Sequence, residues 1–417
     1  MQMQFEFGKK RWKAVGIVDL EPGSVPEFQA QTVAPRLAGE AAHEKTLRVE
    51  LVHRDQPSIA GDLRIGSLRQ KRAHLPLTTL QTVWPQKAEG IAVPSSNNRF
   101  LFARRHRSLL WQGLDTGLSK ASLHVHLEGS IWPETLLEID PALTAEEIHA
   151  NMPRGSFAAF IESYIWLTRR LHTPEHYALA TRHLLDRLAA DGVRYAEITL
   201  SAGVILWRKQ DLAAIYDAIW EESRRASFPV YWIPDATRQF GVEAAMEVAR
   251  FAVERRDRGA VAFGIGGDEA RGPAELFGDV YRFCRENGLH LTCHAGETVG
   301  PESVRAALAI GAERIGHGIA AVKDQALLAE LRERDVPLEI CPTSNVCTGA
   351  VQSLDVHPLR RLWDAGVPIV IDSDDPALFD TSIGREYEIA ATRFGFSEAE
   401  LGQLAANSFR YTFRRSA

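Results

Sequence analysis

The feature of this sequence that most constrains its fold is a regular alternation of strand-like and helical segments, which begins near residue 116. The strand-like runs are short and apolar or β-branched, and segments between them, such as Pro174–Ala190 and Ala274–Asn287, have helical length. The predicted strands are Ser122–Glu128, Val193–Ser201, Val230–Ala236, Val261–Asp268, Leu289–His294, Arg314–His317, Pro337–Cys341 and Pro368–Asp372. Eight strands with crossover helices predict an α/β fold of the (β/α)₈ TIM-barrel type. The long interval from Ser130 to Asp191 predicts extra helices between strands one and two.

Residues 1–115 lack this alternation. Runs such as Glu21–Pro26 and Pro94–Asn98 are rich in Pro, Gly, Ser and Asn, which interrupt regular structure. Thr46–Val52 alternates apolar and polar residues in the manner of a strand. We therefore expect residues 1–115 to form an N-terminal extension, disordered or a small appendage, and residues 116–417 to form the barrel.

Composition argues against several classes of protein. The 48 Lys and Arg residues are outnumbered by 54 Asp and Glu residues, and this mildly acidic mixture does not favour nucleic-acid binding. No apolar run approaches the roughly 18–20 residues that a membrane-spanning helix needs. The first ten residues lack the apolar core of a signal peptide, and four cysteines are too few for a disulfide scaffold of this size. We expect a cytoplasmic enzyme that acts on a small molecule, without a nucleic-acid or membrane partner.

Histidines and acids collect at the predicted strand ends, where the active site of a (β/α)₈ barrel lies. They include His124, His126, Glu128, Asp268, Glu269, His294, Glu297, His317, Asp372, Asp374 and Asp375. Side chains alternate along a strand, so the imidazoles of His124 and His126 point to the same side. Together with His294 and Asp374 they offer the nitrogen and oxygen ligands typical of a Zn²⁺ site.

The distribution of lysines bears on the number of metal ions. Barrel hydrolases with two metal ions usually bridge them with a carbamylated lysine near the end of strand four. No lysine occurs between Lys209 and Lys323, and strand four ends instead in Gly-Gly-Asp-Glu. We therefore expect a single metal ion.

Four motifs occur in order at these strand ends. They are His124-Val-His-Leu-Glu-Gly-Ser130, His294-Ala-Gly-Glu297, Gly316-His-Gly318 and Ser373-Asp-Asp-Pro376. Together they resemble the adenosine/adenine deaminase branch of the amidohydrolase superfamily, over roughly Leu118 to Tyr411. The resemblance implies a barrel of the metal-dependent hydrolase kind. It also implies hydrolytic deamination of a 6-aminopurine nucleoside to the 6-oxopurine and ammonia, by a metal-bound hydroxide.

The resemblance also implies a role for each motif residue. The ligands of one Zn²⁺ per chain would be His124, His126, His294 and Asp374, and Fe²⁺ accepts the same set. The catalytic residues would be Glu297, His317 and Asp374, with Glu297 at N1 of the purine and His317 at the hydroxide. The substrate-binding residues would be His126, Glu128, Gly267 and Asp375, with the backbone of Gly267 at N3 and Asp375 at N7.

Elementary chemistry supports these roles. Metal binding lowers the pKa of water to about 7, which supplies a nucleophile at neutral pH. Attack on C6 requires charge at N1 to be neutralised, and Glu297 can donate a proton there if a dry pocket raises its pKa. His317 can position the hydroxide or take its proton, and Asp374 can pass a proton toward the leaving ammonia. The structural alternative is that Glu297 complements the dipole of a helix beginning near Pro301.

The motifs leave the exact substrate open. Gly267-Asp-Glu269 departs from the Ser-Ser-Glu run of adenine deaminases, whereas Glu128 replaces the Asp of typical adenosine deaminases near the ribose 5′ side. Adenosine and 6-aminodeoxyfutalosine are equal candidates, and the free base adenine is the alternative. Arg238 could meet a substrate carboxylate, or it could be a surface residue that pairs with Glu243. A purine-nucleoside-binding barrel without catalysis is the alternative from another class.

Overall fold

In the computed structural model, the described residues are 17–19, 44–53, 56–66, 74–76, 118–152 and 155–414. The chain divides into two compact units, Met1–Arg105 and His106–Ala417. The second unit contains a single sheet of eight parallel strands in sequential order. The strands are β5 (Lys120–His126), β6 (Val193–Leu200), β7 (Val230–Thr237), β8 (Ala262–Gly266), β9 (His290–Ala295), β10 (Arg314–His317), β11 (Leu338–Ile340) and β12 (Ile369–Ile371). The predicted (β/α)₈ barrel is confirmed.

The barrel closes between its first and last strands at the predicted metal ligands. The N–H of His126 donates to the carbonyl of Asp374 at 2.8 Å, and the N–H of Asp374 donates to the carbonyl of His124 at 3.0 Å. The strands are almost entirely buried, as expected when helices cover a parallel sheet. All eight predicted strands are present. The first predicted strand, Ser122–Glu128, is displaced by two residues from β5, because the chain turns after His126 into the 3₁₀ helix η4 (Glu128–Ser130).

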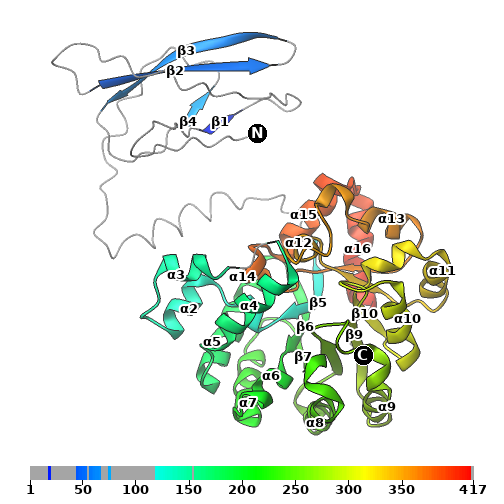
Figure 1. Ribbon diagram of the computed structural model, residues 1–417. Helices are drawn as coiled ribbons and strands as arrows, with labels where there is room; N and C mark the ends of the chain where they lie inside the picture. The colour runs from blue at the N-terminus through cyan, green and yellow to red at the C-terminus, as the bar shows by residue number, and fades with distance from the viewer. Residues whose placement is uncertain are drawn as a thin grey trace. The chain divides into compact units, whose positions relative to one another are not determined.

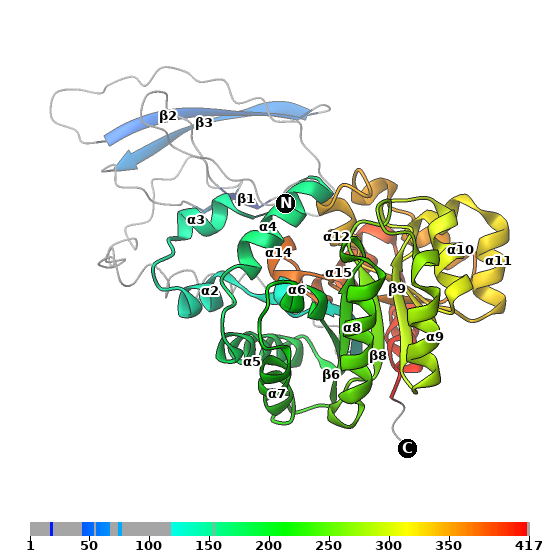
Figure 2. The same ribbon diagram turned by 60° about the horizontal axis from the view of Figure 1, so that its bottom comes forward.

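Helices surround the strands in Figure 1, and Figure 2 shows α8 and α9 alongside β8 and β9. The helices that follow strands or close the chain are α5 (Pro174–Ala190), α7 (Leu212–Ser223), α8 (Gly241–Glu254), α9 (Gly278–Glu286), α10 (Pro301–Ile310), α11 (Gln325–Glu333), α13 (Leu359–Asp364), α15 (Ile383–Phe394) and α16 (Glu398–Arg410). The predicted helix Ala274–Asn287 begins instead as a 3₁₀ turn, η7 (Ala274–Phe277), before α9.

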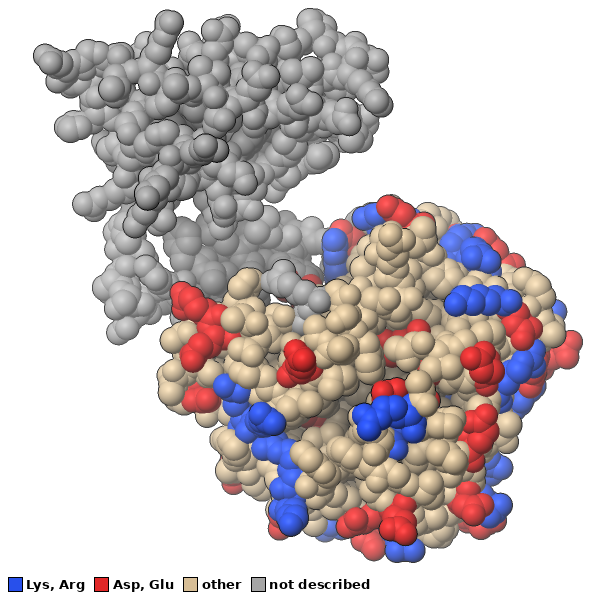
Figure 3. All heavy atoms as spheres, in the orientation of Figure 1, with Lys and Arg blue, Asp and Glu red and all other residues tan. Residues whose placement is uncertain are grey.

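Further helices lie in the loops that follow four of the strands. The predicted extra helices between strands one and two are α2 (Pro133–Ile139), α3 (Ala145–Ala150) and α4 (Phe157–Thr168), which precede α5. Others directly follow strands: α6 (Ala202–Trp207), α12 (Pro342–Cys347) and α14 (Pro376–Phe379). None of the described helices is long and apolar enough to span a bilayer. Acidic and basic side chains are interspersed over the face of this unit that Figure 3 displays.

In the first unit, the described residues form two pairs of strands. β2 (Glu44–His53) runs antiparallel to β3 (Gln56–Gly66), with an irregularity between Leu51 and His53. β1 (Ile17–Asp19) runs parallel to β4 (His74–Pro76). The strand predicted from the alternation at 46–52 is therefore confirmed. The expected boundary at 115/116 and most of the expected extension lie outside the described residues, so the domain division stays a prediction.

Candidate active site and metal centre

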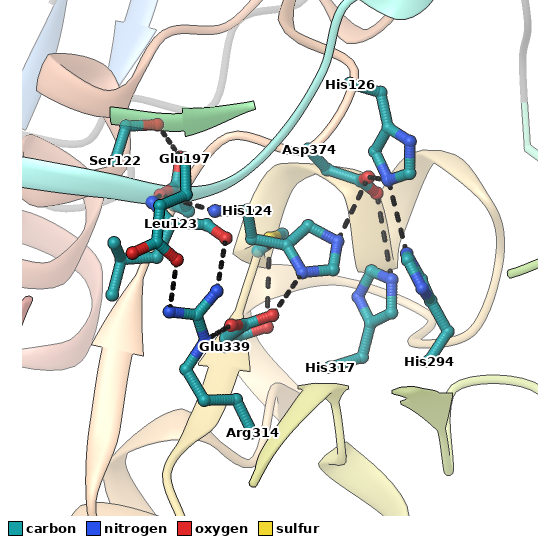
Figure 4. A network of polar contacts seen from close by, with 12 residues as sticks. Ser122, Leu123, His124, His126, Glu197, His294, Arg314, His317, Glu339 and Asp374 are labelled. Carbon is teal, nitrogen blue, oxygen red and sulfur yellow. Dashed lines mark hydrogen bonds and ion pairs between the residues drawn. The ribbon is translucent and has the colours of Figure 1, made fainter. Parts of the chain in front are cut away.

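The predicted metal ligands meet at the C-terminal end of the barrel strands. Nε2 of His126 lies 3.2 Å from Nε2 of His294 and 3.3 Å from Oδ1 of Asp374. Nε2 of His124 lies 3.4 Å from the same carboxylate oxygen. Figure 4 shows these side chains, together with His317, converging on the Asp374 carboxylate. Ligand atoms of His124, His294, His317 and Asp374 all lie within 4.8 Å of one another. His126 forms a second group of this kind with Asp374 and Asp375, so Asp374 is common to both groups.

Backbone geometry at the site is unusual in two places. His317 and Asp374 both have a φ of +62°, in the left-handed region that non-glycine residues rarely occupy. Such conformations cluster at functional sites, where the surrounding structure holds them. The glycine before His317 is required by packing, since a Cβ at Gly316 would lie 2.7 Å from Cε1 of His124.

Hydrogen bonds behind the imidazoles leave ring nitrogens facing the site. Nδ1 of His124 lies 2.7 Å from Oε2 of Glu339, and Nδ1 of His294 donates to the carbonyl of Ile265 at 3.2 Å. The proton is therefore on Nδ1 in both rings, and the lone pair of Nε2 is available to a metal ion. Burial lowers the pKa of His126 to about 4 and holds that of His294 well below its ordinary value, which keeps both rings neutral.

These donors fit a divalent metal ion. Three imidazoles and a carboxylate are a set that Zn²⁺ accepts. The buried Nε2 of His124 has no hydrogen-bond partner among the described residues, which is costly unless a ligand occupies that direction. A metal ion held by His124, His126, His294 and Asp374 would satisfy it.

Side chains of the short helix α12 and of Thr348, its C-cap residue, donate hydrogen bonds to three site residues. Ser344 Oγ donates to Oδ2 of Asp374 at 2.6 Å, and Thr348, directly after the helix, donates from Oγ1 to Oε1 of Glu297 at 3.1 Å. Nδ2 of Asn345 lies 3.0 Å from Nδ1 of His317. Sequence reasoning assigned these residues no role. The signal that could have found Ser344 and Asn345 is their position directly after the predicted strand Pro337–Cys341, at the end of the barrel where active sites lie.

A buried acid organises the loop that carries Glu297. The carboxylate of Glu269 accepts hydrogen bonds from the N–H groups of Gly296, Glu297 and Thr298 at 2.7–2.9 Å, and from Ser303 Oγ at 2.5 Å. With the hydroxyl of Thr298 at 3.3 Å, five donors to one carboxylate fix the loop. The function of Glu269 was not foreseen, although its position after strand four was.

The side chain of Glu297 faces the site. Its Oε2 lies 3.8 Å from Nε2 of His317, and burial raises the pKa of its carboxyl group above the ordinary value. The acid in the first turn of α10 is Glu302, and no described hydrogen bond joins the Glu297 carboxylate to that helix. The Glu297 carboxylate therefore does not cap α10 through a described hydrogen bond, and its role as an acid stays a prediction.

The expected substrate-binding residues line the same end of the barrel. Oδ1 of Asp375 is buried without a hydrogen-bond partner among the described residues, and a Cβ at Gly129 would lie 1.7 Å from it. Oε1 of Glu128 accepts from the N–H of Ser201 at 3.1 Å, and burial raises the pKa of this carboxyl group to about 7. Gly267 has a φ of +95°, which favours glycine.

Neither expected role of Arg238 fits the structure. Its side chain is only 2% exposed, so it is not a surface residue that pairs with Glu243. Its guanidinium donates to the carbonyls of Gly272 and His294 and to Sγ of Cys293. These bonds tie the loop after β8 to the end of β9, and they occupy both terminal nitrogens of the guanidinium, Nη1 and Nη2. Nε is buried without a hydrogen-bond partner among the described residues.

Comparisons with known proteins agree with this geometry. The sequence profile of the family described as adenosine deaminase matches residues 119–416. An aminodeoxyfutalosine deaminase of Streptomyces coelicolor is 39% identical, over 71% of this chain and 80% of the relative. The crystal structure of an adenine deaminase from Arthrobacter aurescens superposes with a TM-score of 0.67 at 29% identity, over 71% of this chain and 94% of that one.

A third relative carries a metal ion. The crystal structure of an amidohydrolase from Burkholderia ambifaria, with bound Zn, has a TM-score of 0.67 at 25% identity, over 78% of this chain and 90% of that one. The family profile covers well over half of the present chain, and the strand-end motifs fall within the matched residues. The chain therefore belongs to the adenosine deaminase family and is a metal-dependent hydrolase of the deaminase class.

Proposed function

We propose that this protein hydrolyses the 6-amino group of a purine nucleoside and releases the 6-oxopurine and ammonia. The observation that carries the proposal is the convergence of Glu297 and His317 on the predicted metal ligands. Nε2 of His317 lies 3.8 Å both from Oε2 of Glu297 and from Oδ2 of Asp374. A proton donor, an imidazole and a metal-binding carboxylate thus face one small volume, as hydrolytic deamination requires.

The metal ion that we propose is Zn²⁺, held by His124, His126, His294 and Asp374. When bound, it would supply Lewis acidity and bring the pKa of water near 7. The relative with bound Zn and the ligand chemistry support zinc. Ser344 donates to Oδ2 of Asp374, which leaves Oδ1 directed at the imidazoles of His124 and His126.

Glu297 is the proposed acid. Its raised pKa favours the protonated form, which can donate to N1 while water adds at C6. Because Thr348 already donates to Oε1, the carboxyl proton would reside on Oε2, the oxygen on the side of His317. The donated proton offsets the negative charge that the ring would otherwise accumulate in the transition state.

His317 and Asp374 would handle the attacking water and the leaving group. His317 lies between the two carboxylates and can hold the attacking oxygen in line with C6. Asp374 can accept the proton of the water and deliver it to the departing amine, which then leaves as ammonia. Water adds at C6 while Glu297 gives its proton to N1, and one proton of the water passes through Asp374 to the amine. The C6–N bond then breaks, and the remaining hydroxyl proton returns to the Glu297 carboxylate. The products are a C6 carbonyl with a proton on N1, and ammonia, so atoms and charge balance.

The remaining groups would orient the purine. We propose that Asp375 meets N7 through its unpartnered Oδ1, that the Gly267 backbone meets N3, and that His126 contacts the substrate beside the metal. Glu128 would stand near the ribose 5′ side. The hydrogen bond from the N–H of Ser201 fixes the position of the Glu128 carboxyl group. The pKa of about 7 of this carboxyl group suits a contact with a hydroxyl group.

Adenosine-like nucleosides are the proposed substrates. We place 6-aminodeoxyfutalosine first, because a relative named aminodeoxyfutalosine deaminase is 39% identical. Free adenine is the second candidate, since the structural relative from Arthrobacter aurescens is an adenine deaminase.

The test is turnover by the zinc-loaded full-length protein over adenosine, deoxyadenosine, adenine and 6-aminodeoxyfutalosine, followed by ultraviolet absorbance and ammonia release. The proposal predicts the highest kcat/KM with a nucleoside. Preference for free adenine would contradict the nucleoside assignment, and binding without ammonia release would contradict catalysis.

A further inference from the structure

A chain of buried hydrogen bonds leads away from the active site behind His317. Nδ1 of His317 lies 3.0 Å from Nδ2 of Asn345, and Oδ1 of Asn345 lies 3.1 Å from Nε2 of His357. Nδ1 of His357 accepts from the N–H of Leu359 at 3.1 Å. His317, Asn345 and His357 are all buried. We refer to these three side chains as the His357 chain.

The hydrogen bond between the backbone N–H of Leu359 and Nδ1 of His357 determines where His357 carries its proton. The N–H of Leu359 can only donate, so Nδ1 of His357 must be an acceptor. Burial lowers the pKa of His357 to about 3, so its ring is neutral. A neutral imidazole carries one proton, which must therefore be on Nε2 of His357.

That proton determines the orientation of the amide. Nε2–H of His357 requires an acceptor, so the carbonyl oxygen of Asn345 must face it. The amide nitrogen of Asn345 then faces His317 and donates to Nδ1. With its Nδ1 accepting, His317 can carry a proton only on Nε2, the nitrogen that faces Glu297 and Asp374.

We propose that Asn345 and His357 are positioning residues that fix His317 as an Nε2–H hydrogen-bond donor toward the attacking oxygen. The proposal rests on the proposed deaminase function. It narrows the two roles considered for His317, because a ring that carries its proton on Nε2 orients the oxygen and cannot take a proton there. Asp374 then remains as the acceptor of that proton.

The first variant reverses the direction of the hydrogen bond between residue 345 and Nδ1 of His317. Asn345→Asp is nearly isosteric, but a carboxylate can only accept, so it would draw the His317 proton onto Nδ1. We expect kcat to fall by about 10²-fold or more, in line with the cost of a wrong imidazole tautomer, while KM changes little. The control is Asn287→Asp, the same change at the C-cap of α9. Asn287 precedes the start of β9, at the end of the barrel opposite the site, so this variant should keep the rate within a few-fold.

The second pair of variants tests His357. His357→Gln keeps an N–H donor for Asn345 Oδ1, whereas His357→Leu removes it and lets the amide turn. We expect Gln to retain most of kcat and Leu to lose roughly tenfold or more, an effect within the range for positioned proton chemistry. Equal losses in both variants, or none in either, would overturn the proposal.

The direct readout is NMR of the zinc-loaded full-length protein with isotope-labelled histidine, which shows which ring nitrogen carries the proton. The proposal predicts a proton on Nε2 of His317 in the wild type and on Nδ1 in Asn345→Asp. A wild-type proton on Nδ1 would overturn it, even if Asn345→Asp fails to fold. If the protein deaminates no purine, the proposed function fails, and the NMR result alone decides the tautomer.

Discussion

Oε2 of Glu339 lies 2.7 Å from Nδ1 of His124, while Oε1 of the same carboxylate lies 2.6 Å from Nε of Arg314. Arg314 in turn pairs with Glu197 at 2.6 Å, and all of these charged side chains are buried (Figure 4). Burial would raise the pKa of Glu339, but the Arg314 charge and the His124 hydrogen bond lower it below its ordinary value. An ionised Glu339 therefore holds the Nδ1 proton of His124 and directs Nε2 at the metal site.

Glu339→Gln should weaken metal binding without removing a metal ligand. The amide can still accept from His124, but the negative charge that makes the ring more basic is lost. We expect metal affinity to fall by about 10–100-fold, measured by competition with a chelator. Glu333→Gln, on the exposed surface of α11, is the matched control and should bind metal normally. Unchanged affinity in Glu339→Gln would show that the contact does not tune His124.

The protein as purified from zinc-supplemented medium should contain close to one divalent ion per chain. The physical reason is that the predicted ligands, which are the imidazoles of His124, His126 and His294 and the Asp374 carboxylate, make one set of four ligands. Elemental analysis after dialysis measures the ratio, and Asp374→Asn should reduce it because a ligand is lost. Two tightly bound ions per chain would contradict the mononuclear site.

The rate should fall at high pH because Glu297 acts in its protonated form. Burial raises the pKa of this carboxyl group, so the active form is present below that raised pKa and is lost as pH increases through it. The profile of kcat/KM against pH, with metal content checked at each point, should therefore show a falling alkaline limb. If the residual activity of Glu297→Gln still falls at the same alkaline pH, a group other than Glu297 causes the fall.

Deletion of residues 1–114 should leave a folded and active enzyme. The described residues of the barrel unit begin at 118, and every proposed catalytic residue lies beyond that point. Circular dichroism, thermal unfolding and kcat/KM of the truncated protein, compared with the full chain, are the measurements. An insoluble or inactive product from a well-behaved parent would show that the extension is part of the catalytic unit.

Much of the barrel could be predicted because its signals are local. Each strand is a short apolar run, so hydrophobic periodicity locates it. Helix ends are marked by residues such as Pro301, the first residue of α10, and Gly311, its C-cap. The rule that barrel active sites lie at strand C-termini then brought His124, His294 and Asp374 together, although they are distant in sequence.

The supporting residues could not be predicted in the same way. Glu339 lies in the middle of a strand, and its partner His124 is 215 residues away, so no local pattern marks the contact. His357 reaches His317 only through Asn345, a relationship that exists in three dimensions alone. Arg238 was misjudged because arginines are mostly exposed, whereas here carbonyl groups and a thiol accept its hydrogen bonds inside the fold.

The most direct test of the central claim is ammonia release by zinc-loaded wild-type protein and by Glu297→Gln, side by side, with 6-aminodeoxyfutalosine and adenosine. We predict one ammonia per 6-oxopurine formed by the wild type. Glu297→Gln should bind metal and nucleoside but lose roughly 10²–10⁴-fold in kcat, because its amide cannot deliver a proton to N1. Glu302→Gln, in the first turn of α10, should retain the wild-type rate. No ammonia from the wild type, or an undiminished rate in Glu297→Gln, would contradict the account.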